Sequence, residues 1–104
     1  MRSRQGDRWS VYLVRRIDHA LYTGIALDVE RRFAAHCAGR GAKALRGRGP
    51  LELVAQRVVG ERSLALRVEH EIKALTKSDK EALVASERRL AAFVSRLVRA
   101  LRDA

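Results

Sequence analysis

Residues 10–16 read Ser-Val-Tyr-Leu-Val-Arg-Arg and residues 20–26 read Ala-Leu-Tyr-Thr-Gly-Ile-Ala, and this pair of segments sets the architecture of the chain. Both are rich in β-branched and aromatic residues, and a three-residue loop separates them, which predicts a β-hairpin. Such a loop pairs Arg16 with Ala20. One face of the hairpin then carries Tyr12, Val14, Tyr22 and Gly24, and the other carries Val11, Leu13, Leu21 and Ile25. A two-residue loop would put the tyrosines on opposite faces, because a slip of one residue inverts every side chain.

A helix is expected directly after the hairpin. Asp28 is a suitable N-cap, and the helical pattern runs to about Gly39. The predicted buried stripe consists of Val29, Phe33 and Cys37. Arg32 and His36 are also spaced i, i+4, so we expect them to project together from one flank. Residues 39–50 hold four glycines and four cations without an apolar period, which predicts a basic loop.

The remaining pattern completes a small layered fold. Residues 51–59 predict a third strand, and the next helix has an apolar stripe of Leu64, Val68, Ile72 and Leu75 with Glu69 at its edge. A capping box formed by Thr76 and Asp79, or by Ser78 and Glu81, predicts one more helix. The order ββαβαα(α) indicates an α/β fold of the α+β type, with a three-stranded, mostly antiparallel sheet flanked by helices.

The C-terminal segment predicts a strongly amphipathic helix. Its apolar positions are Leu90, Phe93, Val94, Leu97, Val98 and Leu101, and arginines surround them. We therefore divide the chain into a domain of residues 1–85 and an added helix of residues 86–104. The apolar face of this helix packs on the domain, pairs with a second copy or another partner, or lies on a membrane surface.

Composition limits the class of protein. The chain has 104 residues, 47% of them hydrophobic and 33% charged, which is typical of one globular domain with a single core. A formal net charge of +10 favours nucleic acid, anionic membrane or an acidic protein as partner, and charge alone does not choose among them. Residues 1–8 lack the apolar core of a secretory signal, and no stretch approaches membrane-spanning length. One cysteine, Cys37, excludes an internal disulfide and is expected to be a buried thiol. We expect a cytoplasmic protein.

The two tyrosine tripeptides carry a family resemblance. Val11-Tyr12-Leu13 and Tyr22-Thr23-Gly24 are followed in order by Arg32, His36 and Glu69. This set resembles the GIY-YIG nuclease superfamily from about residue 9 to residue 84. It looks closest to the small stand-alone YhbQ-like branch, through Gly41-Ala42-Lys43, Arg46-Gly47 and the run Ser63-Leu64-Ala65-Leu66-Arg67.

The resemblance implies an active site around one divalent metal, Mg²⁺ or Mn²⁺. Its catalytic residues would be Tyr12, Tyr22, Arg32, His36 and Glu69, with Gly24 as a structural residue. Glu69 supplies the hard oxygen ligand that Mg²⁺ accepts, and Arg32 can hold a phosphate with two hydrogen bonds. Tyr12 would deprotonate or orient the attacking water, either as a phenolate or by passing its proton to a metal-bound hydroxide. His36 is the rival base, because its ordinary pKa is near 6.5.

Each of these residues also has a purely structural interpretation. Strand tyrosines such as Tyr12 and Tyr22 commonly lie in a core. Glu69 would pair with Lys73 at i+4 as an ordinary helix-surface carboxylate, and His36 would lie on a solvated helix flank.

The resulting hypothesis is a metal-dependent, structure-selective endonuclease that cuts DNA in repair or recombination. DNA is favoured over RNA as the nucleic-acid partner, and the sequence does not decide between them. Lys43, Arg46 and Arg48 on the basic loop would contact backbone phosphates. Aromatic residues make up only 5% of the chain, which argues against a stacking platform for single strands. One alternative is a nucleic-acid-binding module of the same fold without useful catalysis. A second is a partner-binding adaptor working through the C-terminal helix.

Overall fold

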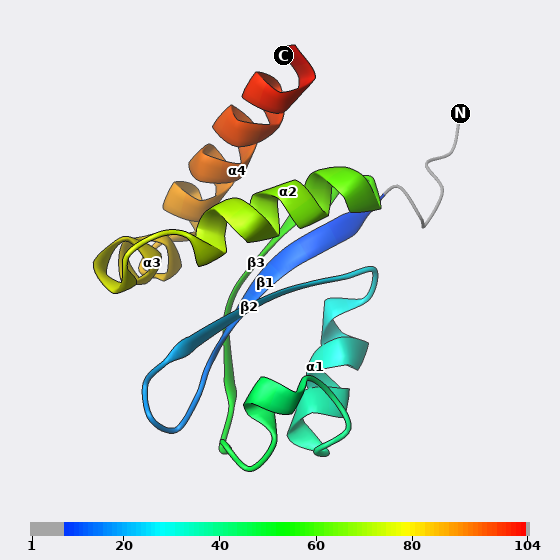
Figure 1. Ribbon diagram of the computed structural model, residues 1–104, viewed down its shortest axis with the longest axis vertical. Helices are drawn as coiled ribbons and strands as arrows, with labels where there is room; N and C mark the ends of the chain where they lie inside the picture. Colours follow the sequence, from blue (N-terminus) through cyan, green and yellow to red (C-terminus); the bar gives the residue numbers. More distant parts are fainter. Residues whose placement is uncertain (1–7, 104) are drawn as a thin grey trace.

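The computed structural model describes residues 8–103, which form three strands and four α-helices (Figure 1). In chain order the elements are β1 (Trp9–Arg15), β2 (Leu21–Ala26), α1 (Val29–Cys37), the short 3₁₀ helix η2 (Lys43–Leu45), β3 (Glu52–Gly60), α2 (Arg62–Lys73), α3 (Lys77–Val84) and α4 (Glu87–Asp103). The α+β class predicted from the sequence is confirmed. The expectation that no secretory signal is present lies almost entirely on residues 1–7, outside the described part of the chain.

The three strands form one antiparallel sheet in the order β2-β1-β3. In the hairpin, Tyr12 pairs with Gly24 and Val14 pairs with Tyr22. Arg16 N–H donates to the carbonyl of Ala20 at 2.9 Å, which closes the predicted three-residue loop. The predicted register is therefore confirmed, and both tyrosines lie on the same face of the sheet.

The face that carries the tyrosines is covered by α1 and by the segment that follows it (Figure 1). Asp28 caps α1 as predicted, since its Oδ1 accepts a hydrogen bond from Arg31 N–H at 3.1 Å. Val29 is buried and Phe33 is partly buried. The predicted stripe is wrong at its third member, because Cys37 is exposed and the neighbouring His36 is buried instead.

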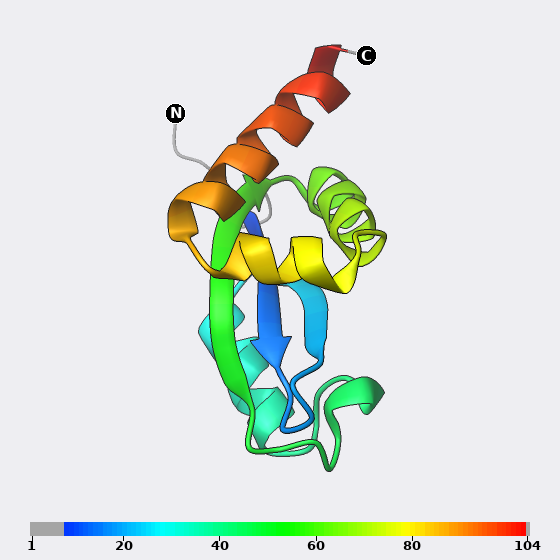
Figure 2. The ribbon, with the colours of Figure 1, turned by 90° about the vertical axis from the view of Figure 1, so that its left-hand side faces the viewer.

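The opposite face is covered by α2, α3 and α4, which enclose the larger part of the core (Figure 1). Thr76 Oγ1 accepts from Asp79 N–H at 3.1 Å, so Thr76, from the first of the two predicted capping pairs, is the N-cap of α3. Leu90, Val94 and Val98 of α4 are buried against β1, α2 and α3. Figure 2 shows β3 at the outer side of the sheet with α4 lying against it. The apolar face of α4 thus packs on its own domain. No helix within residues 8–103 is both long and apolar enough to cross a membrane.

The basic loop is more closely attached to the domain than its composition indicates. Leu45, at the end of η2, is only 2% exposed and packs in the same cluster as Tyr12 and Val14. The N–H of Ile17 in the hairpin loop also donates to the carbonyl of Arg48 at 3.0 Å. The basic loop is therefore held close to the tyrosine-bearing face of the sheet.

Candidate active site

Tyr12 lies at the centre of the candidate site, in the middle strand. Its side chain is 1% exposed, and its ring lies over Gly24 on the adjacent strand. A Cβ atom at residue 24 would come within 2.7 Å of both Cζ and the hydroxyl of Tyr12. Glycine at this position therefore makes room for the hydroxyl end of the Tyr12 ring.

His36 is hydrogen-bonded to the Tyr12 hydroxyl. Its Nε2 lies 2.7 Å from the Tyr12 oxygen, and its Nδ1 accepts a hydrogen bond from Ala42 N–H at 3.0 Å. A backbone N–H can only donate, so Nδ1 must carry the lone pair and the neutral ring must carry its proton on Nε2. Nε2–H therefore donates to the Tyr12 oxygen. Because both ring nitrogens are engaged, His36 has no lone pair available for a water proton, and Tyr12 remains as the candidate base.

Gly41 makes the contact between His36 and Ala42 possible. A Cβ atom at residue 41 would lie 1.9 Å from Nδ1 of His36 and 2.8 Å from its backbone Cα. Any side chain at residue 41 would therefore occupy the position of the imidazole ring. Sequence reasoning assigned Gly41 no role, although the Gly41-Ala42 pair was part of the family resemblance and was the signal available.

The environment keeps both members of this pair neutral. Burial, followed by the neighbouring Tyr22, raises the pKa of Tyr12 to about 12, although Arg32 acts in the opposite direction. Burial and then the positive charge of Arg32 lower the pKa of His36 from its ordinary 6.5. Holding Tyr12 as a phenolate at pH 7 would cost about 7 kcal/mol from these protein groups alone. The neutral phenol is thus the resting form of Tyr12.

Tyr22 and Arg32 complete the side of the site nearest α1. The Tyr22 ring is half-buried, with its centroid 6.3 Å from that of Tyr12 and 5.6 Å from that of His36. Arg32 is exposed and lies close enough to influence the pKa of both Tyr12 and His36. Arg32 and His36 are therefore neighbours, as their i, i+4 spacing predicted. The alternative that placed His36 on a solvated helix flank is wrong, because His36 is 2% exposed.

Glu69 approaches from α2. Its side chain is 16% exposed, and Oε2 lies 3.5 Å from Nζ of Lys73, the ion pair expected of an ordinary helix-surface carboxylate. Its negative charge also contributes to the raised pKa of Tyr12, which brings it into the electrostatic neighbourhood of the site. The carboxylate is therefore partly buried, and its observed partner is the Lys73 ammonium, which the purely structural interpretation had named.

The oxygen ligands at the site are compatible with a magnesium ion that the protein would hold through few of its own side chains. Across residues 8–103, no group of three or more His, Cys, Asp or Glu side chains is placed to hold a metal ion, so these residues build no closed cage. Mg²⁺ usually binds through one or two carboxylates and fills its other positions with water and substrate phosphate. Glu69 provides one such carboxylate.

The three residues predicted to contact phosphates are not part of the buried Tyr12–His36 pair, but they lie on the loop that contacts it. Lys43, Arg46 and Arg48 are all exposed on the basic loop, which also contains the Ala42 N–H that donates to His36. A polyanion that contacts these cations would therefore lie next to the loop that positions the site.

Comparison with known proteins assigns the class. The GIY-YIG catalytic domain matches residues 8–82, and the chain belongs to this nuclease superfamily. Its relatives include UPF0213 proteins. It is 55% identical over 89 residues to the UPF0213 protein YhbQ of Escherichia coli strain K12, covering 86% of this chain and 89% of that protein. A UPF0213 protein of Klebsiella pneumoniae is also 55% identical over 89 residues, covering 86% of this chain and 84% of that protein.

A solved structure supports the fold. The solution NMR structure of the UPF0213 protein BH0048 from Bacillus halodurans superposes with a TM-score of 0.50 at 42% sequence identity. The match covers 75% of this chain and 83% of that protein. The GIY-YIG and YhbQ-like resemblance inferred from the tyrosine tripeptides is confirmed.

Proposed function

We propose that this protein is a metal-dependent endonuclease that hydrolyses phosphodiester bonds in DNA, selects its substrate by structure, and acts in repair or recombination. The hydrogen-bond chain from Ala42 N–H through His36 to the Tyr12 hydroxyl carries the proposal. A buried tyrosine hydroxyl needs a hydrogen-bond partner in any core. Here the partner donates to the oxygen, and a donor stabilises that oxygen when it gives up its own proton. Membership of the nuclease superfamily supports the same conclusion.

Each residue has a chemical task in this reaction. Water attacks the phosphorus, the bond to the leaving oxygen breaks, and negative charge builds on the phosphoryl oxygens. Arg32 binds those oxygens. Tyr12 first loses its hydroxyl proton to solvent, and the resulting phenolate orients the attacking water and accepts its proton as attack proceeds. The Nε2–H of His36 stabilises the charge that develops on the Tyr12 oxygen. A magnesium ion held by Glu69 would supply Lewis acidity at the phosphate.

One observation favours the second candidate function, a nucleic-acid-binding module without useful catalysis. Tyr12 is 1% exposed and its pKa is raised to about 12, so substrate binding has to open a path to its hydroxyl before any proton moves. A module that only binds nucleic acid needs no such opening.

Cleavage assays separate the two functions. Labelled duplex, single-stranded, flap and four-way-junction DNA, together with RNA, would be incubated with Mg²⁺, Mn²⁺ or EDTA. We expect metal-dependent cutting of DNA that is lost in Glu69→Ala and in Tyr12→Phe, while both variants still bind. Salt-sensitive binding without cutting by the unaltered protein would refute the enzyme and support the binding module.

A further inference from the structure

A hollow of ≈ 550 Å³ lies beside the candidate active site, where the start of β1, the end of β2, α1 and the start of α2 meet. Such a volume is within the range of about 300–1,000 Å³ typical of small-ligand sites. Arg32 lines this hollow and also acts on the pKa of Tyr12, so the two sites share a residue. A ligand in the hollow is therefore next to the phosphate that Arg32 would hold for cleavage.

The lining combines an aromatic surface with positive charge. Trp9 is half-buried, and the guanidinium of Arg62 lies 5.4 Å from the centroid of its ring. Arg31 and Arg32 contribute two more guanidinium groups, against a single carboxylate from Asp28. That carboxylate already accepts the N–H of Arg31 as the cap of α1. This lining is chemically complementary to an anion that carries a flat, apolar group.

An unpaired nucleotide has this combination of groups. Unstacked bases bind against aromatic rings and arginine planes, and their phosphates bind to arginine. A base inside a continuous duplex is already stacked and paired, so it cannot reach an indole in a hollow without being unstacked first. The apolar wall formed by Ile25, Ala26 and Leu27 suits the face of a base or the carbon atoms of its deoxyribose, whereas a phosphate alone would gain nothing from it.

We propose that this hollow binds one unpaired nucleotide next to the scissile phosphate, with its base against Trp9 and Arg62 and its phosphate on Arg31. The inference rests on the proposed nuclease function and specifies its substrate class: DNA with unpaired nucleotides near the cut, such as flaps and single-stranded ends. The low aromatic content of 5% argued against a stacking platform for single strands. The proposed site needs no platform, because one aromatic ring is sufficient to stack one base.

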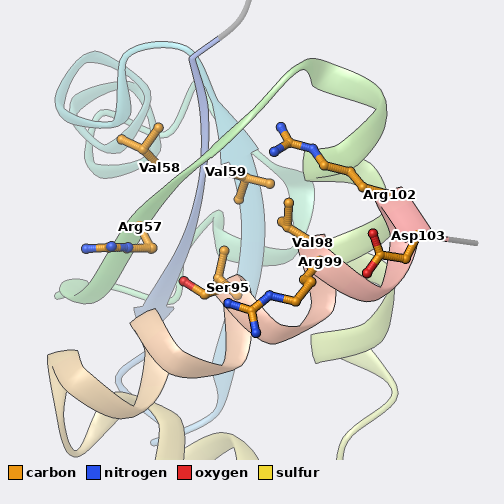
Figure 3. Close-up of a pocket in the computed structure, with 9 residues that line it drawn as sticks. Arg57, Val58, Val59, Ser95, Val98, Arg99, Arg102 and Asp103 are labelled. Atoms are coloured by element: carbon orange, nitrogen blue, oxygen red, sulfur yellow. The ribbon is translucent and has the colours of Figure 1, made fainter.

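A second hollow provides a matched control. Between β3 and α4, Arg57, Arg99 and Arg102 surround a hollow of ≈ 370 Å³, which Val59 and Val98 also line (Figure 3). It carries as many arginines as the first hollow but no aromatic side chain. Removing two of its arginines therefore tests the effect of charge alone.

The test uses the intrinsic fluorescence of Trp9, which is the single tryptophan in the chain. The full-length protein in EDTA would be titrated with a short thymidine oligonucleotide and with an abasic oligomer of the same length. We expect the thymidine oligonucleotide to change Trp9 fluorescence and the abasic oligomer to leave it unchanged. Equal changes with both, or no binding of the thymidine oligonucleotide, would overturn the proposal.

Anisotropy of a labelled thymidine oligonucleotide then tests the individual residues. We expect Trp9→Leu to weaken binding about tenfold, since base–aromatic stacking is worth roughly 1–3 kcal/mol, and Trp9→Phe to restore most of the loss. Arg31→Ala with Arg62→Ala should weaken binding more than Arg99→Ala with Arg102→Ala, and blunt duplex should compete poorly. Equal losses in the two arginine pairs, or equal competition by duplex, would overturn the proposal. Because these are binding measurements without metal, failure of cleavage leaves them interpretable.

Discussion

Gly41→Ala should destabilise the protein and disconnect His36 from Ala42. The added methyl group would lie 1.9 Å from Nδ1 and 2.8 Å from the Cα of His36, so both ring and backbone must move. Overpacking of this kind costs about 1–3 kcal/mol, and a buried acceptor that loses its donor costs about 1–3 kcal/mol more. We therefore expect the free energy of unfolding to fall by about 2–6 kcal/mol, against about 5–15 kcal/mol for a typical domain.

Urea unfolding followed by circular dichroism would measure this loss, and Gly47→Ala is the matched control. Gly47 has a positive φ of 68° and no atom within 4 Å of an added Cβ, so its substitution adds backbone strain of about 1–2 kcal/mol without a steric contact. If Gly41→Ala costs no more than Gly47→Ala, the imidazole does not occupy the space beside residue 41, and the assigned orientation of His36 is wrong.

The contacts of Gly24 and His36 and the burial of Leu90 lead to three further predictions. Gly24→Ala should displace the Tyr12 hydroxyl and lower the single-turnover rate of cleavage by about 10²-fold, and an unchanged rate would contradict the contact at 2.7 Å. Stability should fall as the pH drops below 6.5, because the unfolded chain protonates His36 first while the folded chain, in which its pKa is lowered, does not. His36→Gln should flatten this dependence in urea titrations at successive pH values, and an unaltered slope would assign it to other groups. Leu90→Ala should cost about 2–5 kcal/mol because Leu90 is buried, whereas exposed Arg89→Ala should cost less than about 0.5 kcal/mol; equal losses would show that α4 does not pack on the domain in solution.

Local patterns predicted most of the fold. Alternation and a three-residue loop defined the hairpin and its register, and polar caps defined where α1 and α3 begin. The same patterns failed for Cys37 and for Leu45. A cysteine is normally the better core residue than a histidine, yet His36 is buried because the Tyr12 hydroxyl and the Ala42 N–H satisfy both of its ring nitrogens. Leu45 stands alone in a polar segment, so no periodicity marked it as a core residue.

The candidate site, like the fold, was predicted from the sequence only in part. The order of Tyr12, Tyr22, Arg32, His36 and Glu69 along the chain was sufficient to indicate the superfamily, and the hairpin register placed both tyrosines on one face. The chemical role of His36 was not available from the order of residues, because its proton position depends on a backbone N–H six residues later in the chain.

The amino-acid sequence thus determined by itself the elements, the sheet register and the superfamily, since these depend on hydrophobic period, caps and turn length over short stretches of chain. Only the tertiary structure decided which ring nitrogen of His36 donates, why residue 41 must be glycine, and that Trp9 and Arg62 meet beside Arg32. Those features depend on contacts between segments distant in the chain, where a hydrogen bond or a steric contact of a few ångströms, rather than a pattern of residue types, sets the outcome.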